Sequence, residues 1–220
     1  MQKLVEGVHK FQNEVFGQQA ELFARLAKGQ SPPTLFITCS DSRINPNLIT
    51  QSEPGDLFIL RNAGNIVPSW SSEGSAESAA VEFALVGLGI QDVIVCGHSM
   101  CGAMKGLLDL PSLEKLPSLK SWLRHCEAAR RIVLENYANR SPEQLLNVMI
   151  QENVLAQLDQ LRTHPAVASR LAAGTVRLHG WVYKIETGEV FAYDPEQRQF
   201  KPLSALAMPA IAVKPRALAP

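Results

Sequence analysis

The chain has 220 residues, and its Lys and Arg residues balance its Asp and Glu residues at 21 each. A formal net charge of zero gives no electrostatic reason to expect a nucleic acid or an anionic membrane as a partner. No apolar stretch reaches the roughly 18 residues of a membrane span, and the charged first residues are not typical of a signal peptide. An apolar fraction of 46% supports one sizeable core, and four cysteines fit a reducing compartment, so we expect a single cytoplasmic domain.

In chain order, the pattern predicts an N-terminal helical arm over 1–30, an α/β core over 31–194 and a C-terminal extension over 195–220. Apolar residues at helical spacing predict the arm, with a break near Gly17. Predicted strands cover 34–39, 57–61, 92–96, 175–183 and 189–193. Predicted helices cover 46–50, 75–88, 101–108, 119–138, 142–162 and 165–172. The proline-containing tail from Leu203 is expected to be extended.

The alternation of strands and helices predicts an α/β fold with a mainly parallel sheet flanked by helices. We expect four parallel strands, followed by one antiparallel strand that closes a C-terminal hairpin. In such sheets, sites form at the carboxyl ends of the parallel strands. Cys39 and His98 both follow short apolar strands, so they are expected to meet at this edge.

Two thiols and one imidazole suggest a metal site made of Cys39, His98 and Cys101. Four such ligands close a structural zinc site, whereas three leave a position open for water, as in catalytic zinc sites. Cys96 and Cys126 lie in apolar patterns and are interpreted as small buried hydrophobic residues. A thiol–disulfide exchange site is disfavoured, because the chain lacks a Cys-x-x-Cys pair.

Asp41 and Arg43 stand in the same turn as Cys39 and are close enough in sequence for a bidentate ion pair. A surface pair of no consequence is the plain alternative. A carboxylate held by Arg43 only accepts hydrogen bonds, so it could orient a water or hydroxide at the open metal position.

The motif Cys39-Ser40-Asp41-Ser42-Arg43, together with His98-x-x-Cys101, resembles the β-class carbonic anhydrases. The resemblance extends from the N-terminal arm to the final hairpin. Within the family, the chain most resembles the bacterial enzymes of cyanate operons and the cyanobacterial enzymes. The segments that carry this finer likeness are 61–68, 101–106 and 179–183. The resemblance implies zinc-dependent, reversible hydration of carbon dioxide to bicarbonate and a proton, by a zinc-bound hydroxide that the Asp41–Arg43 dyad orients.

The resemblance also implies one Zn²⁺ per subunit on Cys39, His98 and Cys101, and a homodimer that often assembles into tetramers or octamers. In the family the N-terminal arms wrap the neighbouring subunit, and the active sites lie near the subunit interface. On the substrate side, it implies an amide donor at Gln30 and apolar pocket positions. These positions are Phe58, Ala63, Phe83 and Gly102.

Several positions depart from family patterns. Phe83 stands where plant-type members have a pocket tyrosine, and Gly87 stands where they have a histidine implicated in proton transfer. The inhibitory bicarbonate site of allosteric members has counterparts here in Arg61 and Tyr183, but its tryptophan position is Phe36. The resemblance therefore implies a non-allosteric, plant-type enzyme.

Two rival functions remain open. One is hydrolysis of carbonyl sulfide or carbon disulfide on the same scaffold, since the same zinc hydroxide would serve. The other is a non-catalytic, zinc-bearing assembly protein. Asp41 could also leave Arg43 and close the metal site, an inactive state known in the family. The physiological task, general carbon dioxide supply or bicarbonate recovery during cyanate breakdown, is also open.

Overall fold

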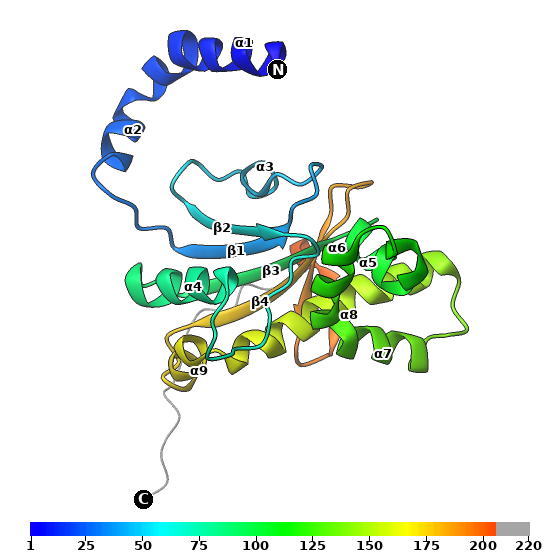
Figure 1. The fold of residues 1–220 in the computed structure, drawn as a ribbon. Helices are drawn as coiled ribbons and strands as arrows, with labels where there is room; N and C mark the ends of the chain where they lie inside the picture. The colour runs from blue at the N-terminus through cyan, green and yellow to red at the C-terminus, as the bar shows by residue number, and fades with distance from the viewer. Residues whose placement is uncertain (206–220) are drawn as a thin grey trace, which may run out of the picture. The chain divides into compact units, whose positions relative to one another are not determined.

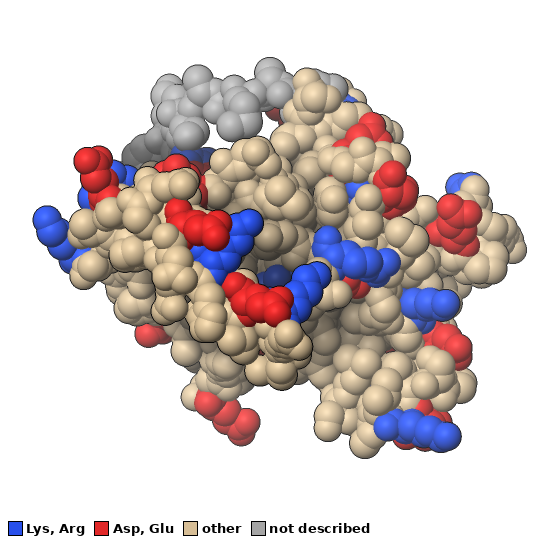
Figure 2. Space-filling model, turned by 90° about the horizontal axis from the view of Figure 1, so that it is seen from above, with Lys and Arg blue, Asp and Glu red and all other residues tan. Residues whose placement is uncertain are grey.

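The computed structural model describes residues 1–205, and the chain divides into two compact units, Met1–Ser31 and the part that begins at Pro32. The predicted extended tail falls mostly outside the described residues. Within them, Leu203–Ala205 forms a short 3-10 turn instead of extended chain. No described helix is both long and apolar enough to cross a bilayer. On the face that Figure 2 shows, positive and negative side chains are interspersed, and neither sign dominates.

The first unit is a run of short helical segments: α1 (Gln2–Lys10), η1 (Phe11–Val15), η2 (Phe16–Gln19) and α2 (Ala20–Leu26). The break predicted near Gly17 is present as a change from π-helix to 3-10 helix. The rings of Phe11, Phe16 and Phe23 pack together with centroids 5.1 to 6.0 Å apart. None of the residues in these segments is buried.

The second unit is built on a six-stranded sheet in the order β2-β1-β3-β4-β5-β6 (Figure 1). The strands are β1 (Thr34–Cys39), β2 (Leu57–Asn62), β3 (Asp92–His98), β4 (Arg177–Tyr183), β5 (Val190–Asp194) and β6 (Gln199–Pro202). β1 to β4 are parallel, and β5 and β6 are antiparallel. The predicted fold class is therefore confirmed. The sequence pattern does not predict β6, because this edge strand is short and ends in a proline.

The helices of this unit are α3 (Pro46–Thr50), α4 (Ala76–Glu82), η3 (Phe83–Gly87), α5 (Gly102–Leu108), η4 (Leu110–Leu113), α6 (Pro117–Trp122), η5 (Leu123–Cys126), α7 (Glu127–Asn136), α8 (Pro142–Thr163) and α9 (Pro165–Ala172). The single helix predicted over 119–138 is wrong, because Leu123–Cys126 winds as a 3-10 turn between α6 and α7. The tighter turn brings Leu123 and Cys126, three residues apart, onto the same buried side.

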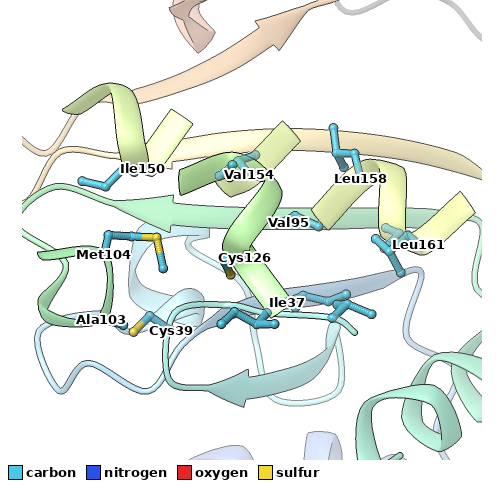
Figure 3. Packing of buried hydrophobic residues seen from close by; sticks show 14 of the residues in the cluster. Ile37, Cys39, Val95, Ala103, Met104, Cys126, Ile150, Val154, Leu158 and Leu161 are labelled. Atoms are coloured by element: carbon cyan, nitrogen blue, oxygen red, sulfur yellow. The ribbon is translucent and has the colours of Figure 1, made fainter. Parts of the chain in front are cut away.

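Helix α8 covers one face of the parallel sheet and supports the strand that carries His98. A capping box of Ser141 and Gln144 begins this helix. Figure 3 shows Ile150, Val154 and Leu158 of α8 beside Val95 of β3. The helix can lie this close because β3 and β4 have glycines below it. A Cβ added to Gly97 or Gly180 would stand 2.9 Å from a Val154 methyl group.

Candidate active site

Three predicted ligands converge at the carboxyl edge of the sheet. Cys39 ends β1, His98 ends the neighbouring parallel strand β3, and Cys101 is the residue before α5. All three are buried, and their ligand atoms lie within 4.8 Å of one another. Since two adjacent parallel strands deliver Cys39 and His98 to the same edge, the tertiary fold accounts for a cluster whose members are far apart in sequence.

The imidazole of His98 is oriented by its own neighbour. Nδ1 lies 2.9 Å from the carbonyl oxygen of Ser99, so Nδ1 carries the proton and Nε2 keeps its lone pair. Nε2 is fully buried and has no hydrogen-bond partner among the described residues. Buried polar atoms are rarely left without a partner, so this nitrogen fits the position of a metal ligand.

The two cysteines differ in their tendency to ionise. Donation from the Cys101 thiol, supported by backbone amides and opposed by burial, lowers the pKa of Cys39 to about 4. One of these amides is the N–H of Gly64, which is 3.4 Å from the Cys39 sulfur. The hydrogen bond to Cys39 and burial raise the pKa of Cys101, which keeps its proton in the absence of a cation. A thiolate, a thiol and an imidazole in contact are a donor set that suits Zn²⁺, which would displace the remaining proton.

Asp41 and Arg43 form the predicted ion pair beside this cluster. Arg43 Nε is 2.9 Å from Oδ1 of Asp41 and Nη2 is 2.8 Å from Oδ2, and the Arg43 amide adds a third bond at 3.0 Å. These bonds from Arg43 hold the pKa of Asp41 well below its usual range, so the carboxylate is ionised. Oδ2 also lies 3.9 Å from Nε2 of His98, so the carboxylate faces the candidate metal position.

Arg61 braces the turn that carries Asp41, a role that the sequence pattern does not reveal. Its Nη2 donates to the carbonyl oxygen of Asp41 at 2.8 Å, and its Nε donates to that of Cys39 at 3.1 Å. Phe36, at the position that separates the subtypes, is fully buried and meets Trp181 edge-on at 6.1 Å. The contacts of Arg61 follow from the parallel register, which places Arg61 beside Thr38 at the ends of β1 and β2.

The predicted substrate positions fall into three places. Phe58 and Phe83 contact each other with ring centroids 6.0 Å apart. Ala63 precedes Gly64, whose amide reaches Cys39, and Gly102 follows Cys101 at the start of α5. Gln30 lies in the first unit, whereas the other four residues lie in the second.

The two departures from the plant-type pattern, Phe83 and Gly87, are linked in the structure. A Cβ at Gly87 would lie 2.8 Å from the Phe83 ring, closer than such atoms approach. The ring occupies the place of that Cβ in this conformation, so a side chain at position 87 would require the ring to turn. Phe83 itself is half-exposed, at 50%.

Comparison with known proteins decides the family. The carbonic anhydrase family model matches residues 34–190. A carbonic anhydrase of the cyanobacterium Synechocystis is 57% identical over 195 residues, which are 88% of this chain and 71% of the relative. The solved structure of the β-carbonic anhydrase CcaA superposes with a TM-score of 0.90 at 55% identity, covering 92% of this chain and 98% of that chain. The chain belongs to the β-class carbonic anhydrases.

This carbonic anhydrase also resembles more distant members of its class. Crystal structures are known for two tetrameric β-carbonic anhydrases of the ascomycete Sordaria macrospora. One of them superposes on this chain with a TM-score of 0.76 at 26% identity, covering 93% of this chain and 96% of that chain. The family and the enzyme class inferred from the Cys39 and His98 motifs are thereby confirmed.

Proposed function

We propose that this β-carbonic anhydrase catalyses the reversible hydration of carbon dioxide to bicarbonate and a proton at the cluster of Cys39, His98 and Cys101. The proposal is carried by one observation: three buried ligand atoms lie within 4.8 Å of one another, and the ionised carboxylate of Asp41 faces them. Three ligands leave one coordination position open, which is the arrangement of a catalytic zinc site.

The cluster would hold one Zn²⁺ per subunit through two thiolates and Nε2 of His98. A zinc ion bound there supplies Lewis acidity that makes a water molecule lose a proton far more readily. Thiolates donate more charge than imidazoles do, so we expect activity to rise at a more alkaline pH than three histidine ligands would give.

Asp41 would act as the hydrogen-bond acceptor that orients the nucleophile. Because Arg43 occupies both carboxylate oxygens, Asp41 stays ionised and cannot rotate freely. Only a group with a proton to donate can approach Oδ2 from the metal side. The lone pair of that donor group would then point away from Asp41 and toward the substrate. Asp41 keeps its pair with Arg43 in this structure, which supports an open fourth position at the metal.

The proposed substrate-side groups are Gln30, Phe58, Ala63, Phe83 and Gly102. Phe58 pairs with Leu35, four residues before Cys39 along the strands, so the aromatic pair Phe58–Phe83 would offer an apolar wall for carbon dioxide at the active site of a neighbouring subunit. The Gln30 amide would donate to a substrate oxygen. Hydrolysis of carbonyl sulfide or carbon disulfide is not favoured, because the relatives described above are named as carbonic anhydrases. A non-catalytic role is not favoured either, since it would not require the Asp41–Arg43 pair.

We further propose that the enzyme works as a homodimer or as a tetramer or octamer built from dimers. The tetrameric Sordaria enzymes support assembly, and so do the exposed apolar side chains of the first unit. The two thiols of the cluster must stay reduced to bind zinc, which supports a cytoplasmic location.

The first test combines metal analysis with stopped-flow assays of carbon dioxide hydration across pH 6.5–9. Asp41→Asn keeps the shape of the side chain but places an N–H where an acceptor is needed, so activity should fall about 100-fold or more while zinc is retained. Cys39→Ser should lose zinc. The matched control is Asp159→Asn, which removes an exposed carboxylate of α8.

Full activity in Asp41→Asn would refute the orienting role of Asp41. Stoichiometric zinc and full activity in Cys39→Ser would refute the ligand assignment. Loss of zinc from Asp41→Asn would instead make Asp41 a ligand or a fold element.

A further inference from the structure

Two amides are buried in the core beneath the candidate metal site. Asn153 and Gln157 lie one turn apart on α8, and both are almost completely inaccessible, at 1% and 0% exposure. Burying an amide is costly unless hydrogen bonds satisfy it. Both form hydrogen bonds with the loop after β2, and Cys126 forms hydrogen bonds with both amides.

The hydrogen bonds among these groups leave only one arrangement of the two amides. Oδ1 of Asn153 accepts from Gln157 Nε2 at 2.9 Å and from the Cys126 thiol at 3.1 Å. Burial raises the pKa of Cys126 to about 12, so this thiol keeps the proton that it donates. Nδ2 of Asn153 is thereby turned toward the carbonyl oxygen of Gly64, at 3.0 Å. Oε1 of Gln157 accepts from the amide of Val67 at 2.8 Å.

Trp122 fixes the peptide group between Ala63 and Gly64 in the same loop. Nε1 of Trp122 donates to the carbonyl oxygen of Ala63 at 2.8 Å. The N–H on the other side of this peptide group belongs to Gly64, and it is the donor 3.4 Å from the Cys39 sulfur. A hydrogen bond to the carbonyl polarises the peptide group and strengthens the N–H as a donor.

The loop has little freedom to move away. Gly64 has a φ of 86°, a conformation that favours glycine. A Cβ there would lie 3.0 Å from the Met104 side chain and 3.2 Å from Ala103, so α5 closes the loop from above. Below it, Asn153 holds the next carbonyl. The amide that reaches Cys39 is therefore held between two helices.

We propose that Trp122 and Asn153, the latter oriented by Gln157, are positioning residues for the metal centre. They hold the peptide between Ala63 and Gly64 so that its N–H donates to the Cys39 thiolate. This donation withdraws negative charge from the sulfur, limits what the thiolate gives to the metal, and keeps Cys39 in place. The inference rests on the proposed function, because it requires a metal on Cys39.

The test uses the full-length protein with cobalt(II) in place of zinc, because thiolate-to-cobalt charge-transfer absorption reports the charge on the sulfur. Trp122→Phe keeps a ring but removes the donor, and Asn153→Leu keeps similar size but removes the bond to Gly64. Each variant should shift the charge-transfer band to longer wavelength, because a sulfur without its N–H donor gives up an electron more easily. Each should also weaken zinc affinity about 10- to 100-fold in chelator competition, because Cys39 would no longer be held in place.

Gln160→Met is the matched control. Gln160 lies one turn beyond the cluster on α8 and donates to the His125 carbonyl, away from the 62–68 loop, so band and affinity should not change. Circular dichroism of the metal-free proteins identifies the folded variants, and Trp122→Phe decides the matter if Asn153→Leu does not fold. Wild-type band and affinity in the folded variants would overturn this inference alone. A wild type that shows no thiolate–cobalt band would overturn the proposed function as well.

Discussion

At the scale of single residues, Ser99 connects the candidate metal site to the hairpin of the sheet. Its carbonyl oxygen orients His98, while its buried hydroxyl donates to Oε2 of Glu186 at 2.5 Å and accepts from the Ile185 amide at 2.9 Å. The tautomer of this candidate ligand thus depends on contacts with the turn after β4. Outer contacts of this kind tune a metal site as much as the ligands do.

Asp92 offers a stability test at the opposite end of β3. Burial opposes its ionisation, but hydrogen bonds from Arg177 and His179 outweigh burial and lower the pKa of Asp92. A carboxyl with a lowered folded-state pKa stabilises the fold above its unfolded pKa, near 4, and this contribution is lost as pH falls through the folded value.

We therefore expect Asp92→Asn to lower the free energy of unfolding by about 1–2 kcal/mol at pH 7, a range that allows for solvent screening. The difference from wild type should shrink as urea denaturation is repeated from about pH 4 downward. Asp159→Asn, which removes an exposed pair with Arg162, should change stability by less than about 0.5 kcal/mol. A difference that persists at the lowest pH would show that the ionised carboxylate is not its cause.

At the scale of elements, the packing of α8 on β3 and β4 places the candidate site. Gly180 lies in the middle of β4, where an added Cβ would be 2.9 Å from Val154 and 3.1 Å from Leu158. Both neighbours are buried on α8, so they have little room to turn away. The same helix carries Asn153, and a shift of α8 would also disturb the loop beside Cys39.

Gly180→Ala should therefore destabilise the fold by about 1–3 kcal/mol, because it overpacks a closely fitted contact. Gly17→Ala is the matched control, since its Cβ would meet no atom within 4 Å and its φ is not positive. That change should be neutral or slightly stabilising. Equal urea midpoints for the Gly180 variant and wild type would show that α8 adjusts freely.

At the scale of the whole molecule, the exposed apolar side chains suggest assembly. Leu4 and Val8 of the first unit are 66% and 54% exposed, and Phe83 and Val86 of the second unit are 50% and 56% exposed. Exposed apolar groups gathered on short helical segments are typical of protein interfaces.

Replacing both Leu4 and Val8 with Glu should weaken the proposed dimer, since each apolar side chain that it would bury between subunits contributes enough for about a tenfold change in dissociation constant. Sedimentation velocity over a range of concentrations should show wild type as a dimer or larger and the variant shifted toward monomer. Gln18→Glu adds charge to the same unit without removing apolar surface. A monomeric wild type, or a variant that assembles as well as wild type, would contradict the proposed assembly.

The sequence alone was sufficient to predict the parallel sheet and the meeting of the three candidate ligands. Short apolar strands followed by Cys39 and by His98 are local signals, and the rule that parallel strands end at one edge converts them into a shared site. The pairing of Asp41 with Arg43 was equally accessible, because the two residues are neighbours in one turn. Local periodicity and short spacing carry this information.

Only the tertiary structure decided which distant groups support those ligands. Asn153 bonds to a loop residue 89 positions earlier, and Trp122 reaches Ala63 across 59 positions. Arg61 acts through backbone carbonyls, which no sequence motif displays. Such contacts arise when helices dock on the sheet, so their residue types show no period or spacing along the chain. The candidate ligands were therefore predictable from local pattern, whereas the groups that contact them depend on long-range packing.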